Sequence, residues 1–175
     1  MKQHADRFLT AIFCDDIRRE EGNKLSFMGC YQSELFVPAM PTVLSKFCVY
    51  ASVFTPKNKP FKALTLRVLQ DDDKELGRIE VPAEGLVEVA RIQDESATRK
   101  SVSTAIVFSP FVIEKPKMLH LMATTEDGEI AGPRLMIKLL PGQENKAPAS
   151  PGEAKPLKQA AGKRKPSATR TTRKT

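Results

Sequence analysis

A short run of charged residues near the start of the chain holds its densest group of chemically active side chains. The run is Asp15-Asp16-Ile17-Arg18-Arg19-Glu20-Glu21; it ends in the turn pair Gly22-Asn23 and is flanked by apolar segments. Carboxylate and guanidinium groups form charge-assisted contacts, and loops on a rigid scaffold often carry binding residues. The functional interpretation is a recognition loop made by Asp15, Asp16, Arg18 and Arg19, although we favour a structural role for these residues. The structural alternative is one helical turn capped by Asp15 or Asp16, with an arginine paired to a carboxylate elsewhere in the domain.

Few other residues suit catalysis. The two histidines are His4, near the terminus, and His120, between Leu119 and Leu121. A hydrolase pair such as Cys48 with His120 is conceivable, because such partners need not be close in sequence. The chain has no nucleophile elbow, Gly-rich phosphate loop, zinc-protease helix motif or paired-cysteine motif. The simpler interpretation makes His120 an outward strand residue, and we expect no enzyme.

Acidic turns raise the question of calcium. Asp71-Asp72-Asp73, Asp127 and Asp15-Asp16 would have to converge from several loops, because calcium takes six to eight oxygen ligands. Lys74 and Arg18 sit directly beside these acids and oppose a cation. We expect ordinary solvated turns, with no metal and no cofactor. A calcium- or ligand-binding C2-like domain is the alternative.

The cysteines and the hydropathy pattern indicate a compartment. Cys14, Cys30 and Cys48 are odd in number, lie in apolar runs and lack metal-ligand spacing. This pattern predicts reduced, buried thiols and a cytoplasmic protein. No apolar run approaches the roughly 18 residues that a membrane helix needs, so we expect no membrane partner.

The net charge lies entirely in the last 35 residues. Of the 28 Lys and Arg and 21 Asp and Glu, residues 141–175 hold nine and two, which leaves 19 of each in residues 1–140. The segment 141–175 is rich in Lys, Arg, Pro and Ala, and lacks aromatic residues. It cannot bury enough apolar surface to offset the entropy of ordering. We predict a domain over 1–140 and a disordered basic tail over 141–175.

The tail is a candidate for nucleic-acid contact. An extended basic chain can follow a phosphate backbone without reading sequence, whereas the absence of aromatic residues argues against base stacking. A purely solubilising tail is the alternative. Residues 155–175 would make the contact, through six cations: Lys163, Arg164, Lys165, Arg170, Arg173 and Lys174.

The elements that would carry these residues are mostly strands. Apolar and polar residues alternate over 43–55 and 61–69, and further strands are expected over 7–14, 24–37, 75–81, 102–114, 117–125 and 134–140. The segment 7–14 is apolar on both faces and is expected at a central position. Pro110 predicts an edge or a switch between sheets, Gly29 a bulge or close approach, and residues 82–93 one helix. The chain is therefore predicted to be mainly β, an Ig-like or C2-like antiparallel β-sandwich of about seven to eight strands with one short helix.

The N-terminal segment also resembles a family of short bacterial domains of unknown function. The resemblance rests on the pattern FCDDIRxExxxKLSxxGxY, from Phe13-Cys14-Asp15-Asp16-Ile17-Arg18 through Lys24-Leu25-Ser26 to Gly29 and Tyr31. It continues through Pro60-Phe61-Lys62 and 64–68, and does not include the tail. The resemblance implies a compact cytosolic domain and no site residues. We therefore expect a non-enzymatic interaction or structural module with an unknown protein partner.

Overall fold

Most of the described chain is β-structure. The computed structural model describes residues 7–92 and 96–142. Within them lie twelve strands and one helix: β1 Phe8–Cys14, β2 Asp16–Glu20, β3 Lys24–Met28, β4 Glu34–Val37, β5 Thr42–Leu44, β6 Phe47–Pro56, β7 Leu64–Gln70, β8 Lys74–Val81, α1 Ala83–Ile92, β9 Arg99–Phe108, β10 Phe111–Ile113, β11 Lys117–Thr125 and β12 Gly128–Leu139. The prediction of a mainly β chain with one short helix is confirmed.

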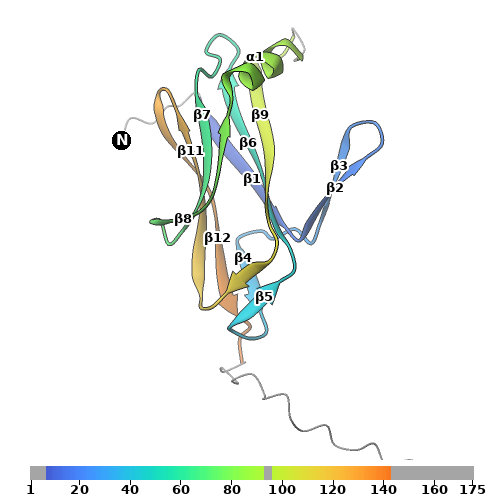
Figure 1. Cartoon of the computed structure of the whole chain (residues 1–175), viewed down its shortest axis with the longest axis vertical. Helices are drawn as coiled ribbons and strands as arrows, with labels where there is room; N and C mark the ends of the chain where they lie inside the picture. The colour runs from blue at the N-terminus through green and yellow to red at the C-terminus, as the bar shows by residue number, and fades with distance from the viewer. Residues whose placement is uncertain (1–6, 93–95, 143–175) are drawn as a thin grey trace, which may run out of the picture. The chain divides into compact units, whose positions relative to one another are not determined.

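The strands form two principal sheets and two small ones (Figure 1). The first has the order β1-β6-β9 and is antiparallel; the second has the order β4-β12-β11-β7-β8, in which only β4 pairs in parallel. Strands β5 and β10 form one two-stranded sheet, and β2 and β3 form a hairpin. The predicted central position of 7–14 is wrong: β1 is an edge strand, and its outward residues Phe8 and Ile12 are exposed.

The two principal sheets share one hydrophobic core. Alternate residues of β6, from Phe47 to Val53, and of β7, from Leu64 to Val68, point into it, as their alternation predicts. Phe47 is fully buried, with its ring centroid 4.8 Å from that of Phe111. Each large apolar side chain that is buried in this way contributes about 1.5–3 kcal/mol to stability. An Ig-like or C2-like arrangement of these sheets stays a prediction.

Glycine allows the sheets to approach closely where β1 crosses β12. A Cβ atom on Gly132 would lie 2.6 Å from Leu9 Cδ2 and 2.7 Å from the Leu121 carbonyl oxygen. Any larger residue would therefore push the two sheets apart at this edge.

Several predicted strands are divided, and this explains the larger strand count. The segment 102–114 breaks at Pro110, so that β9 pairs with β6 whereas β10 pairs with β5; the predicted switch between sheets is confirmed. The segment 24–37 breaks around Gly29 into β3 and β4, and 43–55 breaks at Ser45 and Lys46 into β5 and β6. The predicted helix matches α1, with Pro82 just before it.

Two predictions concern parts of the chain beyond these elements. The predicted tail lies outside the described residues after Gly142, as does His4, so the tail and domain boundary stay predictions. Over residues 7–92 and 96–142, no helix combines the length and hydrophobicity of a membrane span.

Candidate binding surface

The charged run of the sequence is a strand of a tight hairpin, which makes the predicted helical turn wrong. Asp16 to Glu20 pair with Met28 to Lys24, and the turn between the strands has positive φ at Gly22 (74°) and Asn23 (59°). The register leaves a three-residue loop, Glu21 to Asn23, between the paired Glu20 and Lys24, and glycine and asparagine are the residues that tolerate positive φ best. The strand pairing satisfies backbone groups that a single helical turn would leave open. Figure 1 shows this hairpin diverging from the three-stranded sheet.

The base of the hairpin is fixed by Asp15, Gly29 and Tyr31. The Tyr31 hydroxyl donates to Asp15 Oδ1, the Asp15 N–H donates to the Met28 carbonyl at 2.9 Å, and the Tyr31 N–H donates to the Phe13 carbonyl at 2.8 Å. Burial, and then the contact with Asp15, raise the pKa of Tyr31. Gly29 has φ 63°, and a Cβ there would lie 1.9 Å from Asp15 Oδ2. The predicted close approach at Gly29 is confirmed.

Three of the four residues of the predicted recognition loop, Asp15, Asp16 and Arg18, border one groove, and Arg19 does not. Asp16 accepts from Lys46 Nζ at 2.8 Å, and Arg18 Nε lies 3.4 Å from Asp16 Oδ2. The hydrogen bond from Lys46 holds the pKa of Asp16 below its usual value. Asp15 faces Tyr31 instead, and strand alternation places Arg19 on the opposite hairpin face from Arg18. Asp15, Asp16, Arg18 and Lys46 border an open groove of about 790 Å³.

The outward face of the three-stranded sheet is apolar and hydroxyl-rich. Its rows run across β1, β6 and β9, with registers such as Ile12 to Tyr50 to Ala105. The rings of Phe8 and Phe54 stack at 4.6 Å, and Arg99 closes one end of the face over Phe8. The exposed fractions of Phe8, Ile12 and Val107 are 42, 37 and 51%. Such a group of exposed apolar residues is typical of a docking surface.

The hairpin turns its own apolar side toward this face. Ile17, Leu25 and Phe27 are half-buried and share one side of the hairpin with Arg19, which is exposed. The Phe27 ring meets the Tyr50 ring edge-on at 5.1 Å, and Tyr50 lies on the outward face of the sheet. The hairpin and the sheet therefore present apolar side chains to one another, and we name these residues together the apolar docking face: Phe8, Ile12, Ile17, Leu25, Phe27, Tyr50, Phe54, Ala105 and Val107.

Comparison with known proteins identifies the family. The model of DUF6941, a family of unknown function, matches residues 9–138, which include every strand of both principal sheets except the ends of β1 and β12. The chain belongs to the DUF6941 family. The sequence resemblance to a domain family of unknown function is thereby confirmed. No curated protein matches the sequence.

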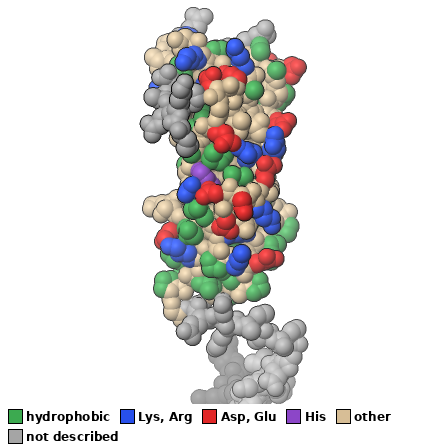
Figure 2. All heavy atoms as spheres, turned by 90° about the vertical axis from the view of Figure 1, so that its left-hand side faces the viewer, with side chains coloured by type: hydrophobic (Ala, Val, Ile, Leu, Met, Phe, Trp, Pro, Cys, Tyr) green, Lys and Arg blue, Asp and Glu red, His purple; other side chains and the backbone are tan. Residues whose placement is uncertain are grey.

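The opposite outward face of the DUF6941 chain, on the five-stranded sheet, is covered by paired charges. Arg67 pairs with Glu129 across β7 and β12, and Lys138 pairs with Glu34 across β12 and β4. On the edge strand, Arg78 pairs with Glu80 at 2.8 Å. Figure 2 shows acidic and basic side chains interspersed along this side of the molecule. The charges of this face therefore already have partners within the domain. On the apolar docking face, by contrast, Phe8, Ile12 and Val107 remain exposed to solvent.

The Cys48 and His120 pair, which the hydrolase alternative would need, does not form. Cys48 lies on β6 and His120 on β11, which belong to different sheets. His120 alternates with core residues as predicted, but its ring is buried rather than exposed, because Asp72 Oδ1 lies 2.7 Å from its Nδ1. Arg134 also contacts Asp72 at 3.4 Å.

Two of the three cysteines are buried, as predicted for thiols of the core. Cys14 and Cys48 are cross-strand neighbours beneath the base of the hairpin, and the Cys48 Sγ lies 3.7 Å from the Asp15 carbonyl oxygen. Burial raises the pKa of Cys14 to about 12, which leaves almost no thiolate at neutral pH. The prediction of burial is wrong for Cys30, which is exposed just after the turn at Gly29.

The acidic turns are separate and already occupied. Asp71 accepts from the Met118 N–H at 2.9 Å, Asp72 faces His120, and Asp127 faces Arg7. Among residues 7–92 and 96–142, no three Asp, Glu, His or Cys side chains are grouped so that they could hold a metal ion. The convergence of loops that the calcium alternative needs is thus missing from this part of the chain. The six tail cations, Lys163, Arg164, Lys165, Arg170, Arg173 and Lys174, lie outside the described residues.

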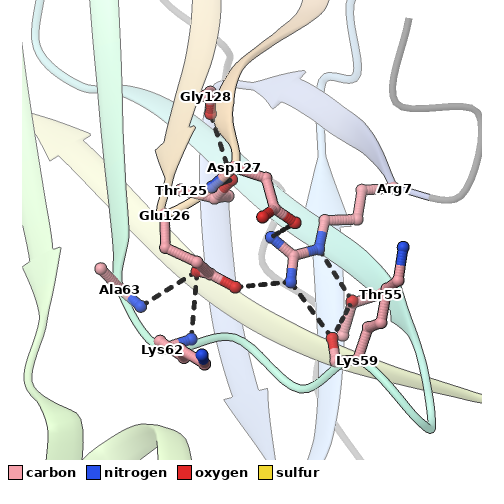
Figure 3. A network of polar contacts seen from close by, with 9 residues as sticks. All are labelled: Arg7, Thr55, Lys59, Lys62, Ala63, Thr125, Glu126, Asp127 and Gly128. Carbon is pink, nitrogen blue, oxygen red and sulfur yellow. Dashed lines mark hydrogen bonds and ion pairs between the residues drawn. The ribbon is translucent and has the colours of Figure 1, made fainter.

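The strongest polar network surrounds a residue that sequence analysis did not single out, Arg7 (Figure 3). Its guanidinium donates to Thr55 Oγ1 at 3.0 Å, to the Lys59 carbonyl at 3.2 Å and to Glu126 Oε1 at 2.7 Å. Asp127 Oδ2 lies 3.0 Å from Nη1, and the Phe61 ring lies under the guanidinium at 4.8 Å. Glu126 in turn accepts from the backbone of Lys62 and Ala63. The network ties the start of β1 to the end of β6 and to the β11–β12 turn, which makes it structural.

Proposed function

We propose that this DUF6941 chain is a non-enzymatic, cytoplasmic interaction module on a β-sandwich scaffold, Ig-like or C2-like, and that it binds another protein through the apolar docking face. One observation carries the proposal: Phe8, Ile12 and Val107 are 42, 37 and 51% exposed on a sheet face whose central rows hold no charged side chain. Leaving such groups in water forgoes about 25 cal/mol per Å² of apolar surface, which a partner would recover.

The chemistry of the face favours one kind of occupant. The rings and branched side chains of the face alternate with the hydroxyls of Thr10, Ser52 and Ser103. Arg99 lies at one end of the face, over Phe8, and the rows beyond it hold no charged side chain. A nucleic-acid backbone would need cations there, and a metal would need carboxylates. The favoured occupant is therefore a mainly apolar protein surface, with Arg19, on the hairpin side that carries Leu25, available for contacts at its rim.

The test is site-specific photo-crosslinking in cells of the source organism. A photoreactive residue is placed at Ser103, on the docking face, or at Glu80, an exposed position on the five-stranded sheet. We expect a discrete adduct with a second protein from Ser103 only, and its loss when Ile12→Lys is added. The matched control, Arg78→Glu on the charged face, should leave the adduct intact. Equal adducts from both positions, adducts with a second copy alone, or no adduct from Ser103 would each overturn the proposal.

A second role, nucleic-acid contact through residues 155–175, is proposed on charge alone, because the nine cations and two acids of 141–175 account for the whole net charge of +7. Fluorescence anisotropy with labelled duplex DNA and RNA, comparing the full chain with 1–140, tests it. Binding by the full chain should weaken steeply with salt and be absent from 1–140. Equal binding by both forms would rule the tail out as the contact.

A further inference from the structure

A small pocket lies at the end of the domain opposite the Arg7 network. It occupies about 250 Å³ where β8, β9, β10 and β11 meet. Phe108, Phe111 and Leu76 give it an apolar wall, and its charged lining is Lys74, Lys115, Lys117 and Glu114. Since a water molecule takes about 30 Å³, the space suits a ligand with a single ring. Three cations against one acid make the pocket electropositive.

Lys117 is the unusual member of this lining. Its side chain is 8% exposed, its Nζ donates to the Val112 carbonyl at 2.8 Å, and Nζ lies 4.5 Å from the centre of the Phe111 ring. An ammonium group has three N–H donors, so two remain for another acceptor. Within residues 7–92 and 96–142, no carboxylate lies within ion-pair distance of Lys117, Lys74 or Lys115.

A buried ammonium without a counter-ion is costly. Taking an ammonium group out of water opposes folding, and a ring face and one carbonyl offset this only in part. Burial lowers the pKa of Lys117 and nearby Lys74 lowers it further, while Glu114 and Asp71 act against them. Methionine would fill the same space without this cost. An anion in the pocket beside Lys117 would supply this counter-charge.

We propose that this pocket binds a small organic anion, a carboxylate or phosphate group on a flat apolar ring, with Lys117 as its anchoring cation. The ring would pack on Phe108 and Phe111, and Lys74 and Lys115 at the exposed rim would draw the anion in. This binding is independent of the apolar docking face, because Lys117 begins a strand of the other sheet.

The experiment is calorimetric titration of the full chain with four compounds that share one ring: benzoate, phenyl phosphate, benzamide and benzylamine. We expect saturable binding of at least one anion, and at least about tenfold weaker binding of the neutral and cationic compounds, because they cannot pair with the ammonium. The ratio of benzoate to phenyl phosphate affinity distinguishes a carboxylate ligand from a phosphate ligand. Equal binding of benzamide, or no binding of either anion at millimolar concentration, would overturn the proposal.

Variants locate the site. Lys117→Met should weaken binding of the anion at least about tenfold, since a hydrogen bond to a charged group contributes about 1.5–3 kcal/mol. Lys74→Met, at the exposed rim, should weaken it by only about two- to threefold, and this variant serves if Lys117→Met does not fold. The matched control is Lys138→Met, a lysine of β12 that pairs with Glu34 outside the pocket. Full binding by both pocket variants, or equal loss in the control, would contradict the assignment.

Discussion

Two buried cations of this domain, Arg7 and Lys117, differ in whether carboxylates surround them. Both are more than nine-tenths buried, and both lie over a phenylalanine ring, Phe61 or Phe111. Arg7 has two carboxylates, a hydroxyl and a carbonyl around it. Lys117 has a carbonyl and no carboxylate at ion-pair distance within the described residues. They mark the two ends of β11, because Lys117 begins this strand and the acids that hold Arg7 follow its last residue.

The difference separates a completed structural site from one that awaits a ligand. A guanidinium offers five donors in a planar fork, and the groups around Arg7 use that geometry. An ammonium is a more strongly hydrated point charge, so its burial without an anion costs more for each contact made. We infer that Arg7 stabilises the fold, whereas Lys117 lowers its stability until the pocket is filled.

The largest expected effect tests the Arg7 side of the comparison. Arg7→Met leaves Glu126 and Asp127 without their cation. Because the side chains of these acids are 22 and 42% exposed, water replaces part of the interaction, and the cost is about 1–3 kcal/mol. We expect urea unfolding at pH 7 to show a loss of that size in the free energy of unfolding. Arg18→Met, which removes a cation with 61% of its side chain exposed, is the matched control and should leave the unfolding midpoint nearly unchanged. A loss below about 1 kcal/mol for Arg7→Met would show that the network contributes no more than an exposed ion pair does, and would contradict its structural role.

Sequence patterns predicted the strands better than they predicted these cations. The alternation of apolar residues in β6 and β7 is local, and the predicted strand 117–125 matches β11 from end to end. Strand β2 was missed because four of its five residues are charged, so no alternation of apolar and polar residues is visible. Ile17 is its only apolar residue, and its pairing with Phe27 becomes visible only in the structure. Arg7 looked like the polar start of a strand, since its acid partners are 119 and 120 positions away. No short-range signal distinguishes such a residue from an exposed arginine.

The location of Lys117 was equally hidden from local patterns. Its burial depends on the chain switching sheets at Pro110, which carries Phe111 and Val112 over the start of β11. Pro110 predicted that the chain changes sheets, but it did not predict which side chains become buried where β10 packs against the start of β11. An apolar alternation of Leu119, Leu121 and Ala123 extending back to a lysine at position 117 was the available signal, because a charged residue at a core position of a strand needs a reason.

The second effect is the acid dependence of the Arg7 network. Burial acts to raise the pKa of Glu126, but hydrogen bonds from Arg7 and from the backbone at Ala63 and Lys62 hold it at about 2, well below its ordinary 4.5. A depressed carboxyl pKa stabilises the folded state above pH 4.5, and this contribution is lost as the pH falls toward 2. Because the Glu126 carboxylate is partly solvated, the contribution that is lost is smaller than the full pKa difference implies, about 1–2 kcal/mol. Urea unfolding between pH 7 and pH 2.5 should show a steeper loss for the parent chain than for Glu126→Gln, and equal slopes would contradict the pairing.

The smallest effect, and the one of opposite sign, concerns Lys117. Lys117→Met removes a desolvated charge, so the free energy of unfolding at pH 7 should stay the same or rise by about 1 kcal/mol. Because folding lowers the pKa of Lys117, the folded state disfavours the ammonium. This penalty is complete below the folded pKa, and it is relieved as the pH rises from there toward the ordinary 10.5. Between pH 7 and pH 10, the free energy of unfolding of the parent chain should therefore rise relative to that of Lys117→Met in parallel urea titrations. If Lys117→Met instead costs as much as Arg7→Met, the carbonyl and ring around Lys117 already complete its site, and the contrast between the two ends of β11 disappears.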